Sequence, residues 1–425
     1  MIMKYTILTF FLSLILGTSL AHGAVIAVNS GEVLQDAIDS ASSGDELVLA
    51  DGVYNTAAVT NKSLSLRSIS GSAQIHSIKF TGATQGSLVK DIRVTNYFES
   101  NQSNVRFYNC EISGGVNATN SVVELIETSV AGDANFTGTS FNGGLSNTLL
   151  FRATINEKLT CETAKSNISY CLIRHAKIAG YSEITGNEFN GRELKGIGID
   201  IVGQSSSVIV RNNRVHQYKF ASAGDDQEKF IGIRISQNAK SEITNNLIYD
   251  IGDWGSGGNE NKVGIGIYVE STSSTKILGN IFWTIYAHQL PSSVIGNVMI
   301  YAPNDNVTIS NNAYWRPPSV YCTSVFVLGG AVNTDAIIGD PKFIDSGNQN
   351  FELNASSSCI NSGPVAAIYN DRDGSRNDIG MFGGHNFIPD GRTTNKPIVL
   401  GLDIAPIAVP TGGTVTIEST GATVK

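Results

Sequence analysis

The feature that most constrains the fold of this chain is a short repeat between Ser182 and Tyr314. Its clearest copies are Ile197–Ile201, Ile231–Ile235 and Ile265–Val269, each 34 residues after the one before. Self-similarity at a fixed period is the signature of a solenoid. Within each copy the apolar residues alternate with other residues, which predicts a strand with one buried face.

A second repeated element, rich in asparagine, lies between these copies. Asparagine tolerates left-handed backbone angles and hydrogen-bonds its own backbone, so this element predicts a turn. Stacked turns would form a ladder of side chains: Asn187, Asn213, Asn246, Asn280 and Asn312. Parallel strands would then pair from coil to coil and bury Ile233 on Ile267.

The N-terminal part of the chain predicts a cap. Between residues 31 and 41 the apolar residues have helical spacing: Val33, Leu34, Ala37, Ile38 and Ala41. The strand Glu46–Ala50 and the turn Asp51-Gly52 follow within the sequence GDELVLADGVY. A helix here would close a solenoid end that otherwise exposes apolar interior and unpaired strand edges.

Two further segments have the composition of a closing region. They run from Gly339 to Pro364 and, as DRDGSRNDIGMFGG, from Asp371 to Gly384. With the repeats and the N-terminal segment, they resemble secreted right-handed parallel β-helix proteins of the pectate-lyase-like superfamily. The N-terminal cap is most similar to that of the alginate lyase and chondroitinase B type polysaccharide lyases. The resemblance implies an all-β fold: a single-stranded right-handed parallel β-helix over residues 24–385 with a short N-terminal capping helix.

Three aspartates in the second closing segment suggest a calcium loop at first sight. Asp371, Asp373 and Asp378 lack the EF-hand spacing and its closing glutamate. We therefore interpret them as turn and cap residues.

The two ends of the chain differ from its centre. Residues 1–23 combine Lys4, the apolar run Ile7–Leu20 and a small-residue cleavage site, which predicts a signal peptide and an extracellular or periplasmic protein. The apolar run is too short for a membrane span. Residues 386–425 contain four prolines and two strand-like stretches. They predict either a hairpin over the C-terminal end of the solenoid or a stub that pairs elsewhere.

Charge and cysteine content narrow the function further. The net charge of −8 argues against a nucleic-acid scaffold but leaves room for an acidic glycan on a local basic patch. The five cysteines, Cys110, Cys161, Cys171, Cys322 and Cys359, are interpreted as small buried hydrophobic residues. A disulfide between Cys161 and Cys171 is the alternative.

The aligned repeats bring charged residues together on one outer face. Asp200, Arg234 and Tyr268 hold the same outward position, with coils stacked about 4.8 Å apart. A lysine precedes each strand (Lys195, Lys229, Lys262), and acidic residues precede the lysines (Glu193, Asp225, Asp226, Glu228, Glu260). Long inserts add His216, Tyr218, Lys219 and Trp254, and long loops on a rigid scaffold often carry sites.

The alternative for this face is a solvated surface whose charges pair at little net energy. By the same reasoning residues 174–177, Arg-His-Ala-Lys, are interpreted as a solvated turn. Trp283 and Trp315 lie beside apolar residues and are interpreted as core or stacking residues.

Two functions follow. The first is a secreted polysaccharide lyase acting by β-elimination on a uronate-containing glycan, which needs a neutralised carboxylate, a base and an acid. In the lyases that this chain resembles, a lysine and an arginine act beside a calcium ion held by asparagine and glutamate. The second is a non-catalytic exported glycan-binding or surface-adhesion protein.

For the lyase, each residue of the outer face has an assigned role. Arg234 would neutralise the carboxylate, because its planar fork binds two oxygens and stays charged. Lys229 would be the base, with a pKa lowered by like charges, and Tyr268 the acid. The substrate-binding residues would be Asp200, Lys195, Lys262, His216 and Trp254, and Ca²⁺ would bind Asp226, Glu228 and Glu260. An epimerase with similar chemistry, and a hydrolase using Asp200, Asp225 and Asp226, remain alternatives.

Overall fold

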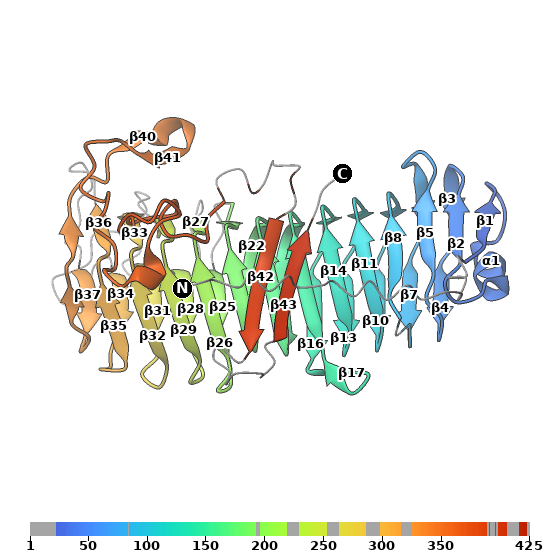
Figure 1. Cartoon of the computed structure of the whole chain (residues 1–425), viewed down its shortest axis with the longest axis horizontal. Coiled ribbons are helices and arrows are strands. Elements are labelled where there is room, and N and C mark those ends of the chain that lie inside the picture. The colour runs from blue at the N-terminus through green and yellow to red at the C-terminus, as the bar shows by residue number, and fades with distance from the viewer. Residues whose placement is uncertain are drawn as a thin grey trace, which may run out of the picture.

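The computed structural model describes residues 23–83, 85–192, 196–218, 229–252, 263–285, 298–315, 325–388, 391, 396, 398–405 and 416–422. The strands lie side by side along one long axis, from the N-terminal coil to the C-terminal coil (Figure 1). They form three parallel ladders, one on each side of the coil, which we name A, B1 and B2. This is the parallel β-helix that the repeats predict; its right-handed sense stays a prediction.

Ladder A contains one strand from each coil. Its strands are β1 (Val25–Val28), β2 (Glu46–Leu49), β5 (Ser65–Ser68), β8 (Ser87–Lys90), β11 (Asn104–Tyr108), β14 (Val122–Ile126), β19 (Asn147–Phe151), β21 (Lys165–Ser169), β23 (Tyr181–Thr185), β26 (Ser207–Arg211), β29 (Lys240–Thr244), β32 (Ser274–Leu278), β35 (Val307–Ser310) and β38 (Asn333–Thr334).

Ladder B1 follows ladder A in each coil. Its strands are β3 (Gly52–Tyr54), β6 (Ala73–Ile75), β9 (Arg93–Val94), β12 (Glu111–Ile112), β15 (Ser129–Val130), the first parts of β20 (Thr154–Thr163) and β22 (Leu172–Ile178), β24 (Glu188–Asn190), β27 (Arg214–Tyr218), β30 (Leu247–Ile251), β33 (Ile281–Ile285), β36 (Ala313–Trp315) and β39 (Ile337–Ile338).

Ladder B2 completes each coil. Its strands are β4 (Ala57–Thr60), β7 (Ile78–Thr81), β10 (Phe98–Asn101), β13 (Val116–Thr119), β16 (Ala134–Gly138), the second parts of β20 and β22, β25 (Ile197–Ile201), β28 (Lys229–Ile235), β31 (Val263–Val269), β34 (Val298–Ala302) and β37 (Val325–Gly329). A small hairpin, β17 (Ser140–Phe141) and β18 (Gly144–Leu145), lies outside the ladders.

Inward side chains of the three ladders form one continuous core along the axis. Ile233 pairs in register with Ile267, as predicted, and both are fully buried. The core also contains the side chains of Cys110, Cys161 and Cys171, and no disulfide joins the described cysteines. The alternative of a Cys161–Cys171 disulfide is therefore wrong, because both side chains pack separately as small hydrophobic groups.

The predicted asparagine ladder is confirmed. The side-chain oxygen of Asn246 accepts from the backbone and side-chain nitrogens of Asn213, both at 3.0 Å. Asn280 does the same for Asn246, at 2.9 Å and 2.9 Å. The ladder runs from Asn187 to Asn312 and is buried, so each amide satisfies backbone groups at the turn that have no strand partner.

The residue before each ladder asparagine forms a second column, on the outside of the same turn. It has a left-handed backbone, as at Asn212 (φ 56°), Asn245 (φ 53°) and Asn311 (φ 53°). Towards the N-terminus the same column continues through Tyr170, Arg152, Glu127, Asn109 and Asp91. Each Asn-Asn pair therefore divides two tasks: the first residue turns the chain and the second lines the interior.

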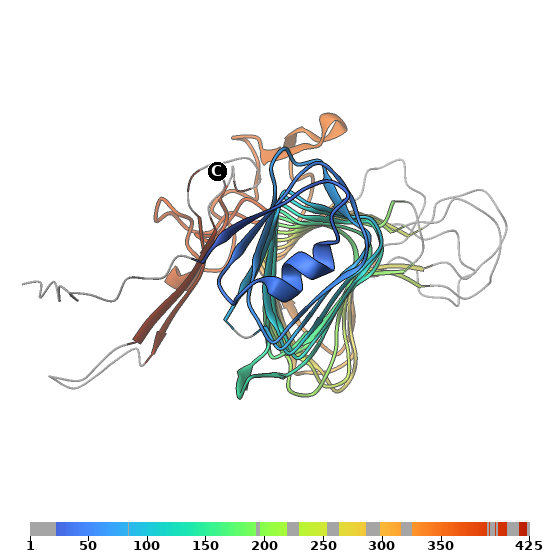
Figure 2. The same ribbon diagram turned by 90° about the vertical axis from the view of Figure 1, so that its right-hand side faces the viewer.

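The N-terminal end is closed by helix α1 (Leu34–Ser40), which lies across the end of the coil (Figure 2). Leu34 and Ile38 are buried against the first coil, as predicted. Lys62 caps the helix, because its Nζ donates to the carbonyls of Ile38 (2.9 Å) and Ala41 (2.8 Å). Val33, expected on the buried face, is instead 55% exposed because the helix begins after it.

Beyond β39 the chain leaves the ladders and runs back along the outside of the coil. We name residues 340–388 the return segment; it contains β40 (Phe343–Asp345), η1 (Ser346–Asn348), β41 (Asn350–Leu353) and η2 (Ala367–Tyr369). It is tied to the outer turn column: Asn311 donates to Ser362, Asn245 to Asp378 and Asn212 to Gly383. Asp371 and Asp378 accept backbone N–H groups, which agrees with their interpretation as turn and cap residues.

The last two strands form an antiparallel hairpin, β42 (Ile398–Ala405) and β43 (Thr416–Ala422). The hairpin crosses the middle coils (Figure 1), where Ile398 packs on Ile126, Phe151 and Tyr170. It therefore lies against the flank of the solenoid and not over its C-terminal end. Residues 1–22 of the predicted signal peptide (1–23) lie outside the described residues, so the signal peptide stays a prediction. No described helix is long and apolar enough to cross a membrane.

Candidate functional site

The B2 ladder carries one straight outward row of side chains along most of the solenoid. In register from coil to coil the row is Lys79, Glu99, Asn117, Asn135, Thr160, Lys177, Asp200, Arg234, Tyr268, Tyr301 and Leu328. The predicted alignment of Asp200, Arg234 and Tyr268 is confirmed. We name this row the B2 track.

A column of glycines interrupts the regular pairing of the B2 strands beside the track. A Cβ on Gly198 would lie 2.6 Å from the Gly232 carbonyl oxygen, and one on Gly232 would lie 2.6 Å from that of Gly266. Only glycine allows this approach. The strict alternation predicted for Ile197, Ile231 and Ile265 is therefore wrong at its first position.

These first isoleucines do not join the main core. Ile231 and Ile265 form a separate buried cluster with Val298, and Tyr268 and Tyr301 pack against it. The track is thus flanked by apolar side chains on its own outer face, which support the two tyrosine rings.

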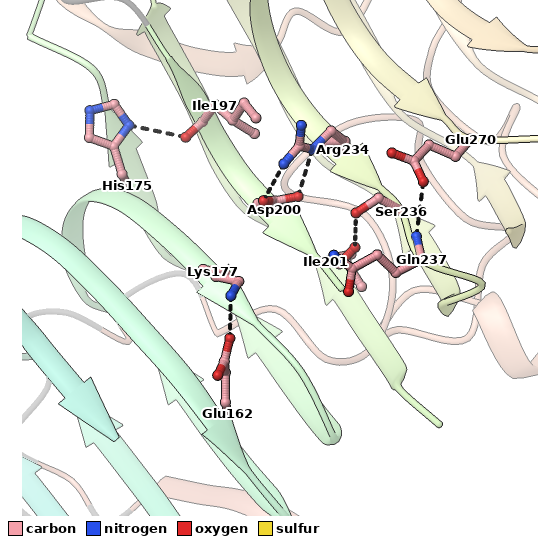
Figure 3. A network of polar contacts seen from close by, with 10 residues as sticks. All are labelled: Glu162, His175, Lys177, Ile197, Asp200, Ile201, Arg234, Ser236, Gln237 and Glu270. Atoms are coloured by element: carbon pink, nitrogen blue, oxygen red, sulfur yellow. Dashed lines mark hydrogen bonds and ion pairs between the residues drawn. The ribbon is translucent and has the colours of Figure 1, made fainter. Parts of the chain in front are cut away.

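Arg234 and Asp200 form a bidentate ion pair at the centre of the track (Figure 3). Arg234 Nε donates to Asp200 Oδ1 at 2.8 Å, and an Nη donates to Oδ2 at 2.6 Å. The hydrogen bonds to Asp200 raise the pKa of Arg234 further. The Arg234 side chain as a whole is 33% exposed, and arginine keeps its charge at any physiological pH.

Tyr268 and Tyr301 form a flat aromatic surface next to Arg234. Their rings are stacked, with centroids 4.9 Å apart and planes 6° apart. Burial and the neighbouring Tyr301 raise the pKa of Tyr268, so its hydroxyl is protonated at neutral pH. Stacked rings of this kind offer an apolar face with polar edges to a ligand.

The segment Arg174–Lys177, interpreted from sequence as a solvated turn, is part of strand β22, and that interpretation is wrong. Lys177 holds the track position next to Asp200 and pairs with Glu162 at 2.5 Å. His175 lies on the same outer face, with Nδ1 3.0 Å from the Ile197 carbonyl oxygen (Figure 3). The only sequence signal was the pattern Ala176-Lys-Ile178, which matches Ile199-Asp-Ile201 once the strands are paired.

Several predicted site residues fall outside the described residues: Lys195, Lys262, Trp254, Asp226, Glu228 and Glu260, together with Glu193, Asp225 and Lys219. Lys229 begins strand β28, where it pairs with Val263, but its side chain is also outside the description. Their roles, and the proposed calcium, stay predictions. Among the described residues, no group of three or more His, Cys, Asp or Glu side chains is placed to hold a metal ion.

His216 lies on ladder B1 and not on the B2 track. Its side chain is only 2% exposed; Nε2 donates to Glu188 at 3.0 Å, and the ring stacks on Tyr249 at 4.7 Å. Burial would raise the pKa of Glu188, but hydrogen bonds from His216 and the charge of Arg214 outweigh it and lower that pKa. Arg214 contacts Glu188 at 2.5 Å. The cluster is a satisfied ion-pair network, apart from His216 Nδ1, which has no hydrogen-bond partner within the part of the chain that the structure describes.

The return segment covers the B1 face beyond this cluster. Phe343 and Phe351 pack on Trp283, and Phe351 also contacts Tyr249. Trp283 is therefore a stacking residue, one of the two roles expected for it. Of the predicted site residues, Asp200, Arg234 and Tyr268 are therefore the ones that the structure places together, on the B2 track.

Comparison with known proteins gives no family model and no curated protein that matches this sequence. Among solved structures, pectate lyase Pel9A matches with a TM-score of 0.42 and 12% identity, covering 86% of this chain and 97% of that chain. A PL6 family polysaccharide lyase from Pseudopedobacter saltans matches with a TM-score of 0.40 and 12% identity, covering 78% and 97%.

The PL6 family alginate lyase AlyGC matches with a TM-score of 0.39 and 12% identity. The match covers 83% of this chain but only 58% of AlyGC, less than two thirds of its length. Likeness at such identity concerns the fold alone. This chain's own three parallel ladders give it the parallel β-helix fold that its sequence predicts.

Proposed function

We propose that the protein is an exported polysaccharide lyase acting on an acidic, uronate-containing glycan that lies along the B2 track. The observation that carries this proposal is the straight outward row, in which the Asp200–Arg234 pair adjoins the Tyr268–Tyr301 stack. An extended glycan parallel to the axis meets one side chain of the row in every coil. The polar and charged side chains of the track would face the carboxylates of the glycan, and its aromatic side chains would face the sugar rings.

Each described residue of the track has a role in this proposal. The exposed side of Arg234 binds a substrate carboxylate, sharing its charge with Asp200. Tyr268, which is protonated at neutral pH, is the proposed donor of a proton to the leaving oxygen. The roles of Lys229 as base, and of Asp226, Glu228 and Glu260 as oxygen ligands of the kind Ca²⁺ prefers, rest on the sequence alone.

A second candidate function is glycan binding without cleavage. It is favoured by the bidentate pair, because Asp200 already occupies the fork that a lyase would offer to the substrate. The two functions differ in turnover but not in the surface they use.

The test uses a panel of uronate polysaccharides, with unsaturated uronate ends measured by ultraviolet absorbance and binding by titration calorimetry. Arg234→Ala is compared with Arg106→Ala, an arginine paired with Glu124 on ladder A, away from the track. The lyase predicts product with wild type and the control variant, and a large loss with Arg234→Ala. Binding without product supports the second function, and neither binding nor product refutes both.

A further inference from the structure

A histidine and a lysine stand side by side on the B2 face, next to the charged part of the track. Lys158 of strand β20 and His175 of strand β22 are paired in register, so their Cα atoms are about 4.8 Å apart. Both side chains point outward, since Leu159 and Ala176, their neighbours along the strands, are buried in the core. Neither belongs to the set predicted from the repeats.

The hydrogen bonding of His175 defines which ring nitrogen is free. Nδ1 lies 3.0 Å from the carbonyl oxygen of Ile197, which can only accept, so Nδ1 carries the proton in the neutral ring. Nε2 then holds a lone pair, and it has no hydrogen-bond partner among the described residues. Figure 3 shows this second nitrogen pointing away from Ile197.

The surroundings of His175 keep the ring neutral. Burial lowers its pKa below the ordinary value, and the bond to Ile197 offsets this only in part. Arg174 and Lys158 lower the pKa further, while Glu157 raises it. The ring of Tyr218 also lies near, with its centroid 5.5 Å from that of His175.

Lys158 supplies a positive charge beside this lone pair. Its backbone N–H is fixed by Asp133 Oδ1 at 3.0 Å, while its side chain is exposed. Lys158 has no ion-pair partner in the part of the chain that the structure describes, whereas Lys177 and Arg234 on the same face are paired. It is thus a cation available to an incoming anion.

We propose that His175 is the proton-accepting residue, and Lys158 the carboxylate-neutralising residue, of the lyase centre on this face. The inference rests on the proposed function. His175 Nε2 takes the proton from the sugar carbon that bears the carboxylate. The electron pair of that C–H bond forms the new carbon–carbon double bond, and the adjacent C–O bond breaks with its electrons on the leaving oxygen. That oxygen takes a proton from water, and the imidazolium returns its proton to solvent.

In this arrangement His175 replaces Lys229 as the base, Lys158 replaces Arg234 as the carboxylate-neutralising residue, and water replaces Tyr268 as the proton donor. The Asp200–Arg234 pair and the two tyrosines then bind neighbouring sugars further along the track. The ion pair between Asp200 and Arg234 then stays intact during turnover. It is therefore no obstacle to catalysis that Asp200 already occupies the Arg234 guanidinium.

The first experiment is the pH profile of kcat/KM on the polysaccharide that the wild type cleaves best. With His175 as base, the rate rises with pH through a midpoint below the ordinary histidine value of about 6.5, and is level above it. With Lys229 as base, the rate keeps rising above neutrality, because a lysine must first lose its proton. That second profile would overturn the inference while leaving the proposed function intact.

The second experiment replaces the base without removing its anchor. In His175→Asn the amide nitrogen can donate to Ile197 as Nδ1 does, but nothing replaces Nε2. We expect a loss in kcat/KM of roughly 10²- to 10⁴-fold, the usual contribution of a general base, with unchanged binding. His385→Asn, at an exposed histidine of the return segment, is the control and keeps wild-type activity. A near-wild-type rate in His175→Asn refutes the assignment; no product with wild type on any glycan refutes the proposed function and this inference with it.

The third experiment tests Lys158 by its charge. Lys158→Met lowers kcat/KM on the free uronate polymer, and Lys158→Arg restores most of it, since both cations bind carboxylate. On a methyl-esterified polymer, whose carboxyl groups carry no charge, the lysine and methionine forms have the same rate. An equal loss on both polymers indicates a structural role and refutes the neutralising one.

Discussion

Replacing Asn246 by alanine tests the asparagine ladder. The Asn246 amide nitrogen donates to the carbonyls of Val210 (2.9 Å) and Thr244 (3.0 Å), and to the Asn280 side chain (2.9 Å). Its oxygen accepts from the backbone N–H of Asn213 at 3.0 Å. The side chain is fully buried, so no water replaces these bonds in the variant.

The magnitude follows from the groups left without partners. An orphaned buried donor or acceptor costs about 1–3 kcal/mol. Asn246→Ala orphans the Asn213 N–H and removes a donor from two carbonyls, so we expect the free energy of unfolding to fall by about 3–5 kcal/mol. The measurement is urea unfolding monitored by circular dichroism. The dependence of the unfolding free energy on urea concentration should be the same for variant and wild type, so that the two values can be compared.

The matched control is Asn117→Ala. Asn117 Oδ1 accepts from Asn135 Nδ2 at 3.1 Å in the next coil, but on the exposed face. Water can replace this bond, so the change should stay within about 0.5 kcal/mol. We attribute the stability that the ladder contributes to the burial of its hydrogen bonds and not to their number. An equal loss of unfolding free energy in Asn246→Ala and Asn117→Ala would refute this.

Three further outcomes are expected. Asn245→Gly keeps the left-handed turn, since Gly279 already has this backbone at the equivalent position, but it loses the hydrogen bonds to the return segment. Amide hydrogen exchange should therefore become faster over residues 371–384 while the coils stay protected. Gly232→Ala places a Cβ 2.6 Å from a carbonyl oxygen of the next coil, and a lower thermal midpoint, from a cost of about 1–3 kcal/mol, should follow. Burial raises the pKa of Cys110 to about 12, so its thiol should resist alkylation at neutral pH until the protein is denatured.

The sequence predicted the coil interior well, because it repeats. Ile233 over Ile267 and Asn213 over Asn246 follow from spacing alone, since each coil contributes one residue to each ladder. The same spacing aligned Asp200 with Arg234. What the sequence could not show was the close approach at Gly232, because contact between the backbones of adjacent coils leaves no periodic signal.

The sequence did not predict the roles of some residues, because these depend on the register between coils or on partners far away in the chain. His175 belongs to a coil whose length differs from the 34-residue repeat, so its place beside the track depends on the bulge in strand β20. The outward side chain of Asn245 binds Asn377, 132 residues later, and nothing local predicts such a partner. His216 was expected on the outer patch because it opens a long insert, but strand β27 extends through it to Tyr218.

The return segment changes how such a solenoid can deform. A stack of coils held only by its neighbours can bend or open at any one coil, since each repeat touches only the next. Here a second strip of chain runs lengthwise beside the stack and is attached at Asn311, Asn245 and Asn212. This strip reinforces the stack, because opening one coil also strains the attachments on the others. The C-terminal half should therefore resist pulling and local opening as a single unit. The coils before Glu127 should instead open one at a time.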